Sequence, residues 1–245
     1  FQKIQVIRNA TYGNVLLLDG LVQTTEKDEF FYHEMLVHPA CSSHPSPRNV
    51  LIIGGGDGGA LREVLRYGVT SARMVEIDAR VVEVCKKHFP WLRADLKDKR
   101  AQIIIGDGNA YVRETREKFD VILVDSSDPV GPSAVLHEKA FYARLKNCLA
   151  PRGIIAAQAG SQLFHVDHHA AKMVFLKKMF KHAHIYNGPV PTYPGGTWCY
   201  IFLSDAVDPL RSRSLRLPDG LRYINLETFK AAFALPQFMK ERLKA

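Results

Sequence analysis

From Asn49 onward the chain alternates between apolar runs and segments with helical periodicity, and this alternation constrains its fold more than any other feature. The predicted strands cover residues 50–53, 73–77, 102–105, 120–124 and 153–158. The predicted helices cover residues 60–67, 79–88, 138–149 and 167–180, with a further one from Asn109. The run 121–124 is continuous rather than alternating, which is typical of a strand buried on both faces of a parallel sheet. Repeats of this kind predict an α/β fold, with a mostly parallel, Rossmann-like sheet and helices on both faces.

The segments on either side of this repeat also carry clear signals. Near the N-terminus, residues 2–7 alternate polar and apolar side chains, and Asp19-Gly20 is a hairpin turn signal between two short apolar runs. Residues 28–38 are predicted to form a helix that ends at Pro39. Residues 183–186 and 198–203 are predicted to close the sheet as an antiparallel pair. The predicted division is an N-terminal β-strand region, residues 1–26, followed by a Rossmann-like domain, residues 27–245.

The net charge of +8 raises the question of a nucleic-acid partner. The basic residues are dispersed, however, and their densest groups, at 86–87, 97–100 and 177–178, fall in amphipathic or loop segments. No zinc-finger spacing or RNA-binding aromatic motif accompanies them. We therefore expect a solvated basic face and no nucleic-acid partner.

Hydropathy and cysteine usage restrict the environment of the protein. No apolar run approaches the ~20 residues that span a bilayer, so no membrane partner is expected. The four cysteines contain no C-x-x-C pair, which indicates reduced and mostly buried thiols. Because reduced thiols are typical of a reducing compartment, we expect a cytoplasmic protein.

Two acids, Asp125 and Asp128, follow the apolar run 121–124 directly. Pro129 and Pro132 break the chain after them, which places the acids in a loop at the carboxyl end of a strand. Ligands of open α/β sheets bind at that edge. Since no lysine or arginine lies between the two acids, the loop predicts a site for a cation or for removing a proton.

Acids also follow the three preceding predicted strands. The glycine run 54–59 joins a strand to a helix, and such loops let the backbone approach a ligand closely. Asp57 inside this loop would repel a phosphate, which favours a nucleoside without phosphates or a cationic group. Glu76 ends the next strand, where an acid typically accepts hydrogen bonds from ribose hydroxyls. Asp107-Gly108 follows the third strand, where an adenine edge would lie.

Taken together, these motifs resemble the spermidine synthases, which are polyamine aminopropyltransferases with the fold of the S-adenosylmethionine-dependent methyltransferases. The segments that carry the resemblance are 18–23 (LDGLVQ), 26–30 (EKDEF), 32–35 (YHEM), 52–59 (IIGGGDGG), 76–78 (EID), 107–108 (DG), 125–132 (DSSDPVGP), 191–195 (PTYPG) and 232–236 (AFALP). The resemblance covers nearly the whole chain. It implies a small N-terminal β-strand domain, shortened here because the family usually has further strands before position 1, and a homodimer or homotetramer.

The resemblance also implies a role for each matching residue. Asp125 would be the base that accepts a proton from the attacking amine of putrescine. Asp57 would bind the aminopropyl amine of decarboxylated S-adenosylmethionine, and Glu76 would hold its ribose. The rest of this donor would contact Gln2, Asp107, Gly108 and Pro132. The polyamine channel would be formed by Tyr32, His33, Asp128 and Tyr193.

His33 stands where some relatives carry glutamine, so it adds a titratable group to the implied channel. The decarboxylated donor is a co-substrate, and neither a cofactor nor a metal is expected. His165, His168 and His169 have spacings that suit a metal on one helix face, but a solvent-facing helix is the favoured interpretation.

Physical chemistry agrees with these roles. A primary amine is mostly protonated at pH 7, since its reference pKa is about 10.4, and it attacks only after losing that proton. A strand-end carboxylate binds the ammonium and then accepts the proton. Asp57 also accounts for donor choice, because ordinary S-adenosylmethionine carries a carboxylate that would be repelled by this acid.

Four alternatives stay open on the sequence alone. The acceptor amine could be cadaverine, agmatine or spermidine instead of putrescine. The enzyme could be a diamine N-methyltransferase that uses ordinary S-adenosylmethionine. The chain could also be a non-catalytic nucleoside- or polyamine-binding protein, or a nucleic-acid-binding module. Acceptor length depends on loops near 158–164 and 190–198, whose conformation the sequence does not define.

Overall fold

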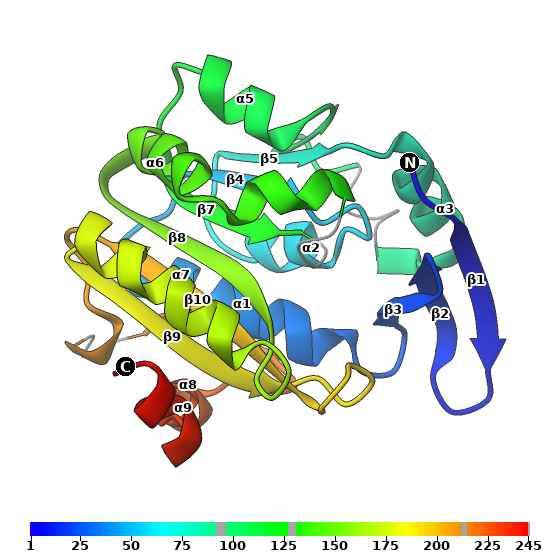
Figure 1. Cartoon of the computed structure of the whole chain (residues 1–245). Helices are drawn as coiled ribbons and strands as arrows, with labels where there is room; N and C mark the ends of the chain where they lie inside the picture. Colours follow the sequence, from blue (N-terminus) through cyan, green and yellow to red (C-terminus); the bar gives the residue numbers. More distant parts are fainter. Residues whose placement is uncertain (92–96, 127–130, 212–214, 245) are drawn as a thin grey trace.

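Two β-sheets organise the computed structural model, which describes residues 1–91, 97–126, 131–211 and 215–244 (Figure 1). The small antiparallel sheet contains β1 (Ile4–Asn9), β2 (Gly13–Leu18) and β3 (Leu21–Thr25). The large sheet has the strand order β6-β5-β4-β7-β8-β10-β9. Its strands are β4 (Asn49–Gly54), β5 (Ser71–Glu76), β6 (Ala101–Ile105), β7 (Phe119–Asp125), β8 (Leu149–Ser161), β9 (His182–Pro189) and β10 (Thr197–Ser204).

The large sheet is mostly parallel, as predicted. Strands β4 to β8 run parallel to one another, while β10 is antiparallel to both of its neighbours, β8 and β9. This arrangement confirms the α/β fold. The antiparallel pair at the end of the chain is confirmed as well.

Helices cover both faces of the large sheet (Figure 1). Along β4, Val50 and Ile52 pack against one face, where α1 (Glu29–Ser43) and α2 (Gly59–Leu65) lie. Leu51 and Ile53 point to the opposite face, because successive side chains of a strand alternate. That face is covered by α5 (Gly108–Glu114), α6 (Lys139–Asn147) and α7 (Val166–Met179). Burial on both faces explains why the strands are so uniformly apolar.

The small sheet lies at one end of the molecule beside α3 (Ala79–His88) (Figure 1). Leu16 of β2 packs there against Val81, Cys85 and Phe89. Asp19 and Gly20, with φ of 50° and 82°, form the predicted hairpin turn, in which both central residues need positive φ. The remaining described elements are η1 (Gly131–His137), η2 (Pro209–Arg211), α8 (Leu226–Ala232) and α9 (Gln237–Arg242). Among the described residues, none of the helices combines the length and apolar character that crossing a membrane demands.

Helix α1 corrects one prediction, because it continues through Pro39 to Ser43 instead of ending at the proline. Proline has no N–H, so the carbonyl of Met35, four residues earlier, loses its helical partner. The hydroxyl of Tyr186, on β9, donates a hydrogen bond to this carbonyl at 2.9 Å. Met35 and Tyr186 are fully buried. A tertiary contact thus satisfies the group that the proline leaves unpaired.

This contact gives a stability prediction. Tyr186→Phe should lower the free energy of unfolding by about 1–3 kcal/mol, because it leaves the buried carbonyl of Met35 without a donor. In a Pro39→Ala background the alanine N–H can bond that carbonyl, so the same substitution should cost less. Urea unfolding of the two single variants and the double variant measures this coupling, and equal costs in both backgrounds would contradict the explanation.

Candidate active site

The site is built around the point where the strand order of the large sheet reverses. Strands β5 and β6 extend from one side of β4, whereas β7 and β8 extend from the other, so β4 and β7 are neighbours at the switch point. Gly54, the last residue of β4, pairs with Asp125, the last residue of β7. A Cβ atom on Gly54 would lie 2.2 Å from the carbonyl oxygen of Asp125, and its φ is 84°. Only glycine fits here, and it brings the glycine-rich loop against Asp125.

Asp125 is a partly buried carboxyl group with an elevated pKa. Burial and the neighbouring charge of Asp57 raise the pKa of Asp125 to about 6, while His33 and Tyr32 act in the opposite direction. The hydroxyl of Tyr32 donates a hydrogen bond to Asp125 Oδ1 at 2.6 Å. A carboxylate with this pKa is ionised at pH 7, and it is also a stronger base than an ordinary aspartate.

A chain of alternating charges runs beside Asp125. His33 Nδ1 lies 2.6 Å from Glu29 Oε2, and His33 Nε2 lies 3.3 Å from Asp57 Oδ2. Arg62 binds both oxygens of Glu29, at 3.0 and 2.8 Å. Burial alone would lower the pKa of His33, but the carboxylates of Asp57 and Glu29 raise it well above its ordinary value. His33 is therefore held as a cation.

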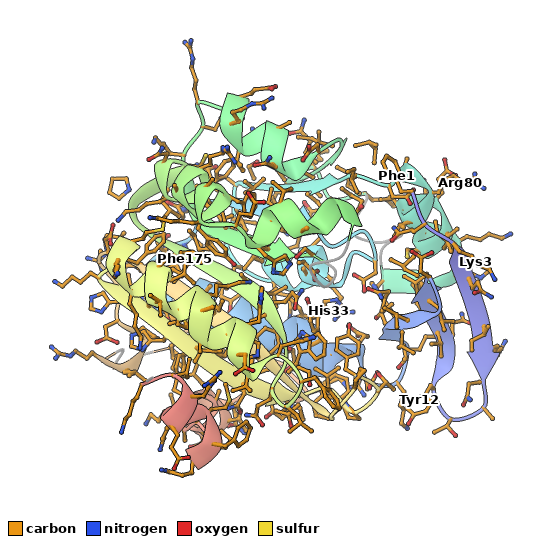
Figure 2. The ribbon with its side chains drawn as sticks, viewed as in Figure 1. Phe1, Lys3, Tyr12, His33, Arg80 and Phe175 are labelled. Carbon is orange, nitrogen blue, oxygen red and sulfur yellow. The ribbon has the colours of Figure 1, made fainter. Side chains whose placement is uncertain are left out.

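Glycine 59 makes the approach of this histidine possible. A Cβ atom on Gly59 would lie 2.2 Å from the His33 ring. Figure 2 shows His33 in the interior of the molecule, far from Tyr12 at the tip of the small sheet. The N–H of Gly59 also donates to Asp57 Oδ1 at 2.9 Å, which fixes the Asp57 carboxylate from its other side.

Glu76, at the end of β5, occupies the other side of the glycine-rich loop. Its Oε2 accepts a hydrogen bond from the N–H of Gly56 at 3.1 Å, and its Oε1 accepts one from the N–H of Asp78 at 2.9 Å. Burial raises the pKa of Glu76 to about 6. Gln2 reaches this region from the N-terminus, because its Nε2 donates to Asp78 Oδ2 at 3.3 Å. Asp78 thus contacts both Gln2 and Glu76, and Glu76 contacts the loop, while the contacts of Gln2 and Glu76 with a donor stay predictions.

Asp107 and Gly108 lie after β6, at the carboxyl edge of the next strand. The side chain of Asp107 is the N-cap of α5 and accepts the N–H of Asn109 at 2.7 Å. Gly108 is buried, and a Cβ atom there would lie 2.5 Å from the side chain of Ile53. Capping occupies one oxygen of Asp107, whereas Glu76 and Asp57 each have partners on both carboxylate oxygens.

An aromatic wall faces Tyr32. The ring centroid of Tyr32 lies 5.7 Å from that of Tyr193, and the ring centroid of Tyr193 lies 4.7 Å from that of Trp198. The hydroxyl of Tyr193 donates to the backbone carbonyl of Gln23. Asp28 Oδ2 accepts hydrogen bonds from the N–H and hydroxyl of Thr192, at 3.0 and 2.8 Å, and so holds the loop that carries Tyr193.

Two predicted site residues cannot be compared with the structure. Asp128 lies outside the described residues. The backbone of Pro132 belongs to η1, but its side chain is not among those described. Their assignments stay predictions.

Sequence reasoning missed several residues of the site. Glu29 carried a usable signal, because it precedes His33 by four residues on one helix, where side chains meet. Arg62 had no such signal, since its contact depends on how α1 packs against α2. Gln158 links the aromatic wall to the loop after Asp125, because it accepts from Trp198 Nε1 at 3.0 Å and donates to the carbonyl of Ser126 at 2.7 Å.

The histidines considered as metal ligands at the start of α7 make other contacts. His165 Nδ1 accepts the N–H of Ser161 at 3.1 Å, and His169 Nε2 lies 3.1 Å from the carbonyl oxygen of the same residue. These two rings therefore bind the backbone at the end of β8. Within the site itself, atoms of His33, Asp57 and Asp125 lie within 4.8 Å of one another. Both ring nitrogens of His33 already face carboxylates, which does not suit metal coordination.

A mostly parallel sheet with helices on both faces, and with acids at its switch point, defines an α/β protein of the Rossmann-like class with a ligand site at that edge. Comparison with protein-family models identifies the particular family. Residues 29–211 match the model for the spermine/spermidine synthase domain, and residues 1–26 match that for the spermidine synthase tetramerisation domain. The chain belongs to the spermine/spermidine synthase family.

Individual relatives agree with this result. The polyamine aminopropyltransferase of Leptospira biflexa is 43% identical over 247 residues, which cover the whole of this chain and 88% of that protein. The enzyme of the same name from Bacillus cytotoxicus is 41% identical over 246 residues, covering the whole chain and 90% of the relative.

Solved structures are similar as well. A spermidine synthase in complex with the transition-state analogue AdoDATO has a TM-score of 0.95 at 38% identity, over 99% of this chain and 85% of that one. The spermidine synthase of Thermotoga maritima has a TM-score of 0.92 at 37% identity, over 100% of this chain and 84% of that one. The small N-terminal sheet beside a mostly parallel sheet is the architecture of these enzymes, and this chain is an aminopropyltransferase.

Proposed function

We propose that this aminopropyltransferase transfers the aminopropyl group of decarboxylated S-adenosylmethionine to putrescine, giving spermidine and 5′-methylthioadenosine. The observation that carries the proposal is the position of Asp125. Its basic, partly buried carboxylate lies beside the anionic Asp57, with Glu76 on the other side of the glycine-rich loop. Two separate carboxylates next to a nucleoside-type loop suit two cationic substrates.

The roles follow from charge and position. Asp57 anchors the aminopropyl ammonium of the donor, and Glu76 accepts hydrogen bonds from its ribose. Gln2, Asp107, Gly108 and Pro132 surround the rest of the nucleoside. On the acceptor side, Asp128 contributes a polar contact, and the rings of Tyr32 and Tyr193 bind a polyamine cation by cation–π interaction. His33 borders this channel and orients Asp57, since both of its ring nitrogens already face carboxylates. The donor is a co-substrate, and we propose that neither a cofactor nor a metal takes part.

The transfer step is a nucleophilic displacement. The acceptor ammonium gives a proton to Asp125, and the freed nitrogen attacks the methylene next to the sulfonium. A C–N bond forms while the C–S bond breaks, and its electron pair leaves on sulfur as a neutral thioether. Because burial raises the pKa of Asp125 to about 6, the gap to the amine pKa of about 10.4 is smaller than for an ordinary aspartate. Holding donor and nucleophile in line supplies a further part of the rate.

Acceptor identity is tested with a panel of amines. The protein is incubated with decarboxylated donor and putrescine, cadaverine, agmatine or spermidine, and products are identified by mass. We expect spermidine from putrescine, with kcat/KM for cadaverine lower by about 10–200-fold, which is the usual discrimination for one methylene. Preference for another amine would overturn the proposed acceptor but not the aminopropyl transfer. Methylated products from ordinary S-adenosylmethionine would overturn the transfer itself.

The pKa of Asp125 predicts a pH profile. The base is active when deprotonated, so kcat/KM should rise as pH increases through about 6 and level off above it. Tyr32→Phe removes a hydrogen bond that lowers the pKa of Asp125, so this limb should move to higher pH. Steady-state rates between pH 5 and 8 measure both curves, and an unshifted limb in the variant would contradict the assignment.

Assembly and location complete the proposal. The match of residues 1–26 to a tetramerisation domain supports a homo-oligomer, which we propose to be a dimer or a tetramer. The four cysteines are buried and free, which supports a cytoplasmic location.

A further inference from the structure

A second group of chemically capable side chains lies at the edge of the large sheet, on β9. His182 and His184 are two residues apart on this strand, so their side chains share one face. Their rings are nearly parallel, with an interplanar angle of 9° and centroids 6.5 Å apart. Asp208, directly before η2, reaches the same place. In the sheet, β8 and β10 lie between the strand of this group and β7, which carries Asp125.

The spacing of these three side chains suits a shared ion better than direct hydrogen bonds. His184 Nε2 lies 3.5 Å from Asp208 Oδ1, and His182 Nδ1 lies 3.7 Å from Asp208 Oδ2. These distances exceed normal hydrogen bonds. Ligand atoms held about 2.0–2.2 Å from a tetrahedral Zn²⁺ lie roughly 3.3–3.5 Å apart. One atom from each of the three residues falls within 4.8 Å of the others, so a small closure would bring them to that spacing.

We propose that His182, His184 and Asp208 bind a divalent first-row transition metal, for which Zn²⁺ is the best-matched ion. Two imidazoles and one carboxylate are a common donor set for such metals. His184 Nε2 is shielded from solvent and, in the part of the chain that the structure describes, has no hydrogen-bond partner. This differs from His33, whose two nitrogens both face carboxylates.

The electrostatics of the group define how the ion binds. The N–H of Leu210 donates to Asp208 Oδ1 at 3.0 Å and orients the carboxylate. Arg211 Nε lies 3.5 Å from Asp208 Oδ2 and competes with a metal for it. A bound ion would replace this weak, exposed pair and would tie η2 to β9.

The coordination shell has room for a further ligand. Two members of the group, His182 and Asp208, line a depression of about 470 Å³, where Ser43, Arg152 and Lys181 are their neighbours. Three protein ligands leave the fourth tetrahedral position for a water molecule or an anion from this depression. The cations around it disfavour a bare dication, so we expect the affinity to be modest and to depend on Arg211.

Calorimetric titration with Zn²⁺ tests the proposal on the full chain, prepared without a histidine tag and dialysed against a chelator. We expect one ion per chain at this site and binding at least about 10-fold weaker in His184→Gln. Arg211→Ala should bind more tightly, because it removes the competing cation. His88→Gln serves as the matched control, since His88 lies on α3 outside the group, and it should bind like the parent chain. Co²⁺ should give the visible absorption of a four-coordinate site in the parent chain and in Arg211→Ala.

Three results would overturn the proposal. Absence of Zn²⁺ binding would do so directly. Unchanged binding in His184→Gln would place the ion elsewhere. Displacement of the ion by methylthioadenosine would place it in the active-site cleft, beside His33 and Asp125. Because the readout is metal binding and not turnover, each of these results is independent of the proposed aminopropyl transfer.

Discussion

The Asp125→Asn variant is expected to lose about 10²–10⁴-fold in kcat, which is the usual contribution of a positioned general base. An amide cannot accept the proton of the acceptor ammonium. Its oxygen can still accept the hydrogen bond that Tyr32 donates at 2.6 Å, so the shape of the site should persist. Methylthioadenosine should therefore bind with nearly unchanged affinity. Single-turnover rates with product detection by mass, together with calorimetric binding, measure the two effects separately.

A matched control separates this loss from a general effect of removing an acid. Asp167→Asn changes an exposed carboxylate at the start of α7, whose surface ion pair with Arg242 contributes little to stability. This variant should keep full turnover. If Asp125→Asn retained more than a tenth of the parental rate, Asp125 would not be the base, and the assignment would have to pass to another group near the acceptor.

The strand-end acids were predictable because parallel strands align their carboxyl ends at one edge. The sequence placed Asp57, Glu76 and Asp125 at the ends of three strands of the repeat, and the pairing of Gly54 with Asp125 brings two of these ends into register. Apolar runs define the strands and glycines define the turns, so neither depends on distant contacts. The net charge of +8 gave no such guidance, since the total charge of a chain does not show where its acidic side chains gather.

The charge network around His33 was only half predictable. The pairing of Glu29 with His33 follows from their spacing on one helix. Arg62 binds the same glutamate from α2, and that contact depends on helix packing that no local pattern encodes. The raised pKa of His33 depends on Asp57 and Glu29 together, so it could be recognised only after α1 and the glycine-rich loop were brought together.

Pro39 shows how tertiary structure overrides a local rule. Proline ends most helices because it leaves a carbonyl unpaired and crowds the preceding turn. The hydroxyl of Tyr186, on β9, donates a hydrogen bond to that carbonyl in α1, although the two residues are 151 positions apart in the sequence. The prediction that the helix ends at Pro39 was wrong for this reason, and nothing within residues 28–43 signals the exception.

Asp57→Asn should change donor choice more than any other single substitution in the site. Ordinary S-adenosylmethionine differs from the decarboxylated donor by a carboxylate beside the amine that Asp57 is proposed to anchor. Unfavourable contact between like charges costs several kcal/mol, and each 1.4 kcal/mol corresponds to about a factor of ten. We therefore expect the ratio of kcat/KM for the two donors to fall by roughly 100-fold. Part of this fall comes from slower transfer with the decarboxylated donor.

The positive charge of His33 should make the fall in the donor ratio of Asp57→Asn larger. In the parent chain Asp57 offsets this charge at 3.3 Å. In Asp57→Asn the pKa of His33 falls, but Glu29 at 2.6 Å still favours the cation, and the charge that remains is free to attract the carboxylate of ordinary S-adenosylmethionine. Asp57→Asn combined with His33→Gln removes both charges, so its donor ratio should lie between those of the parent chain and the single variant. Paired assays of the two donors, with products quantified by mass spectrometry, give these ratios. An unchanged ratio in Asp57→Asn would show that donor discrimination lies elsewhere in the pocket.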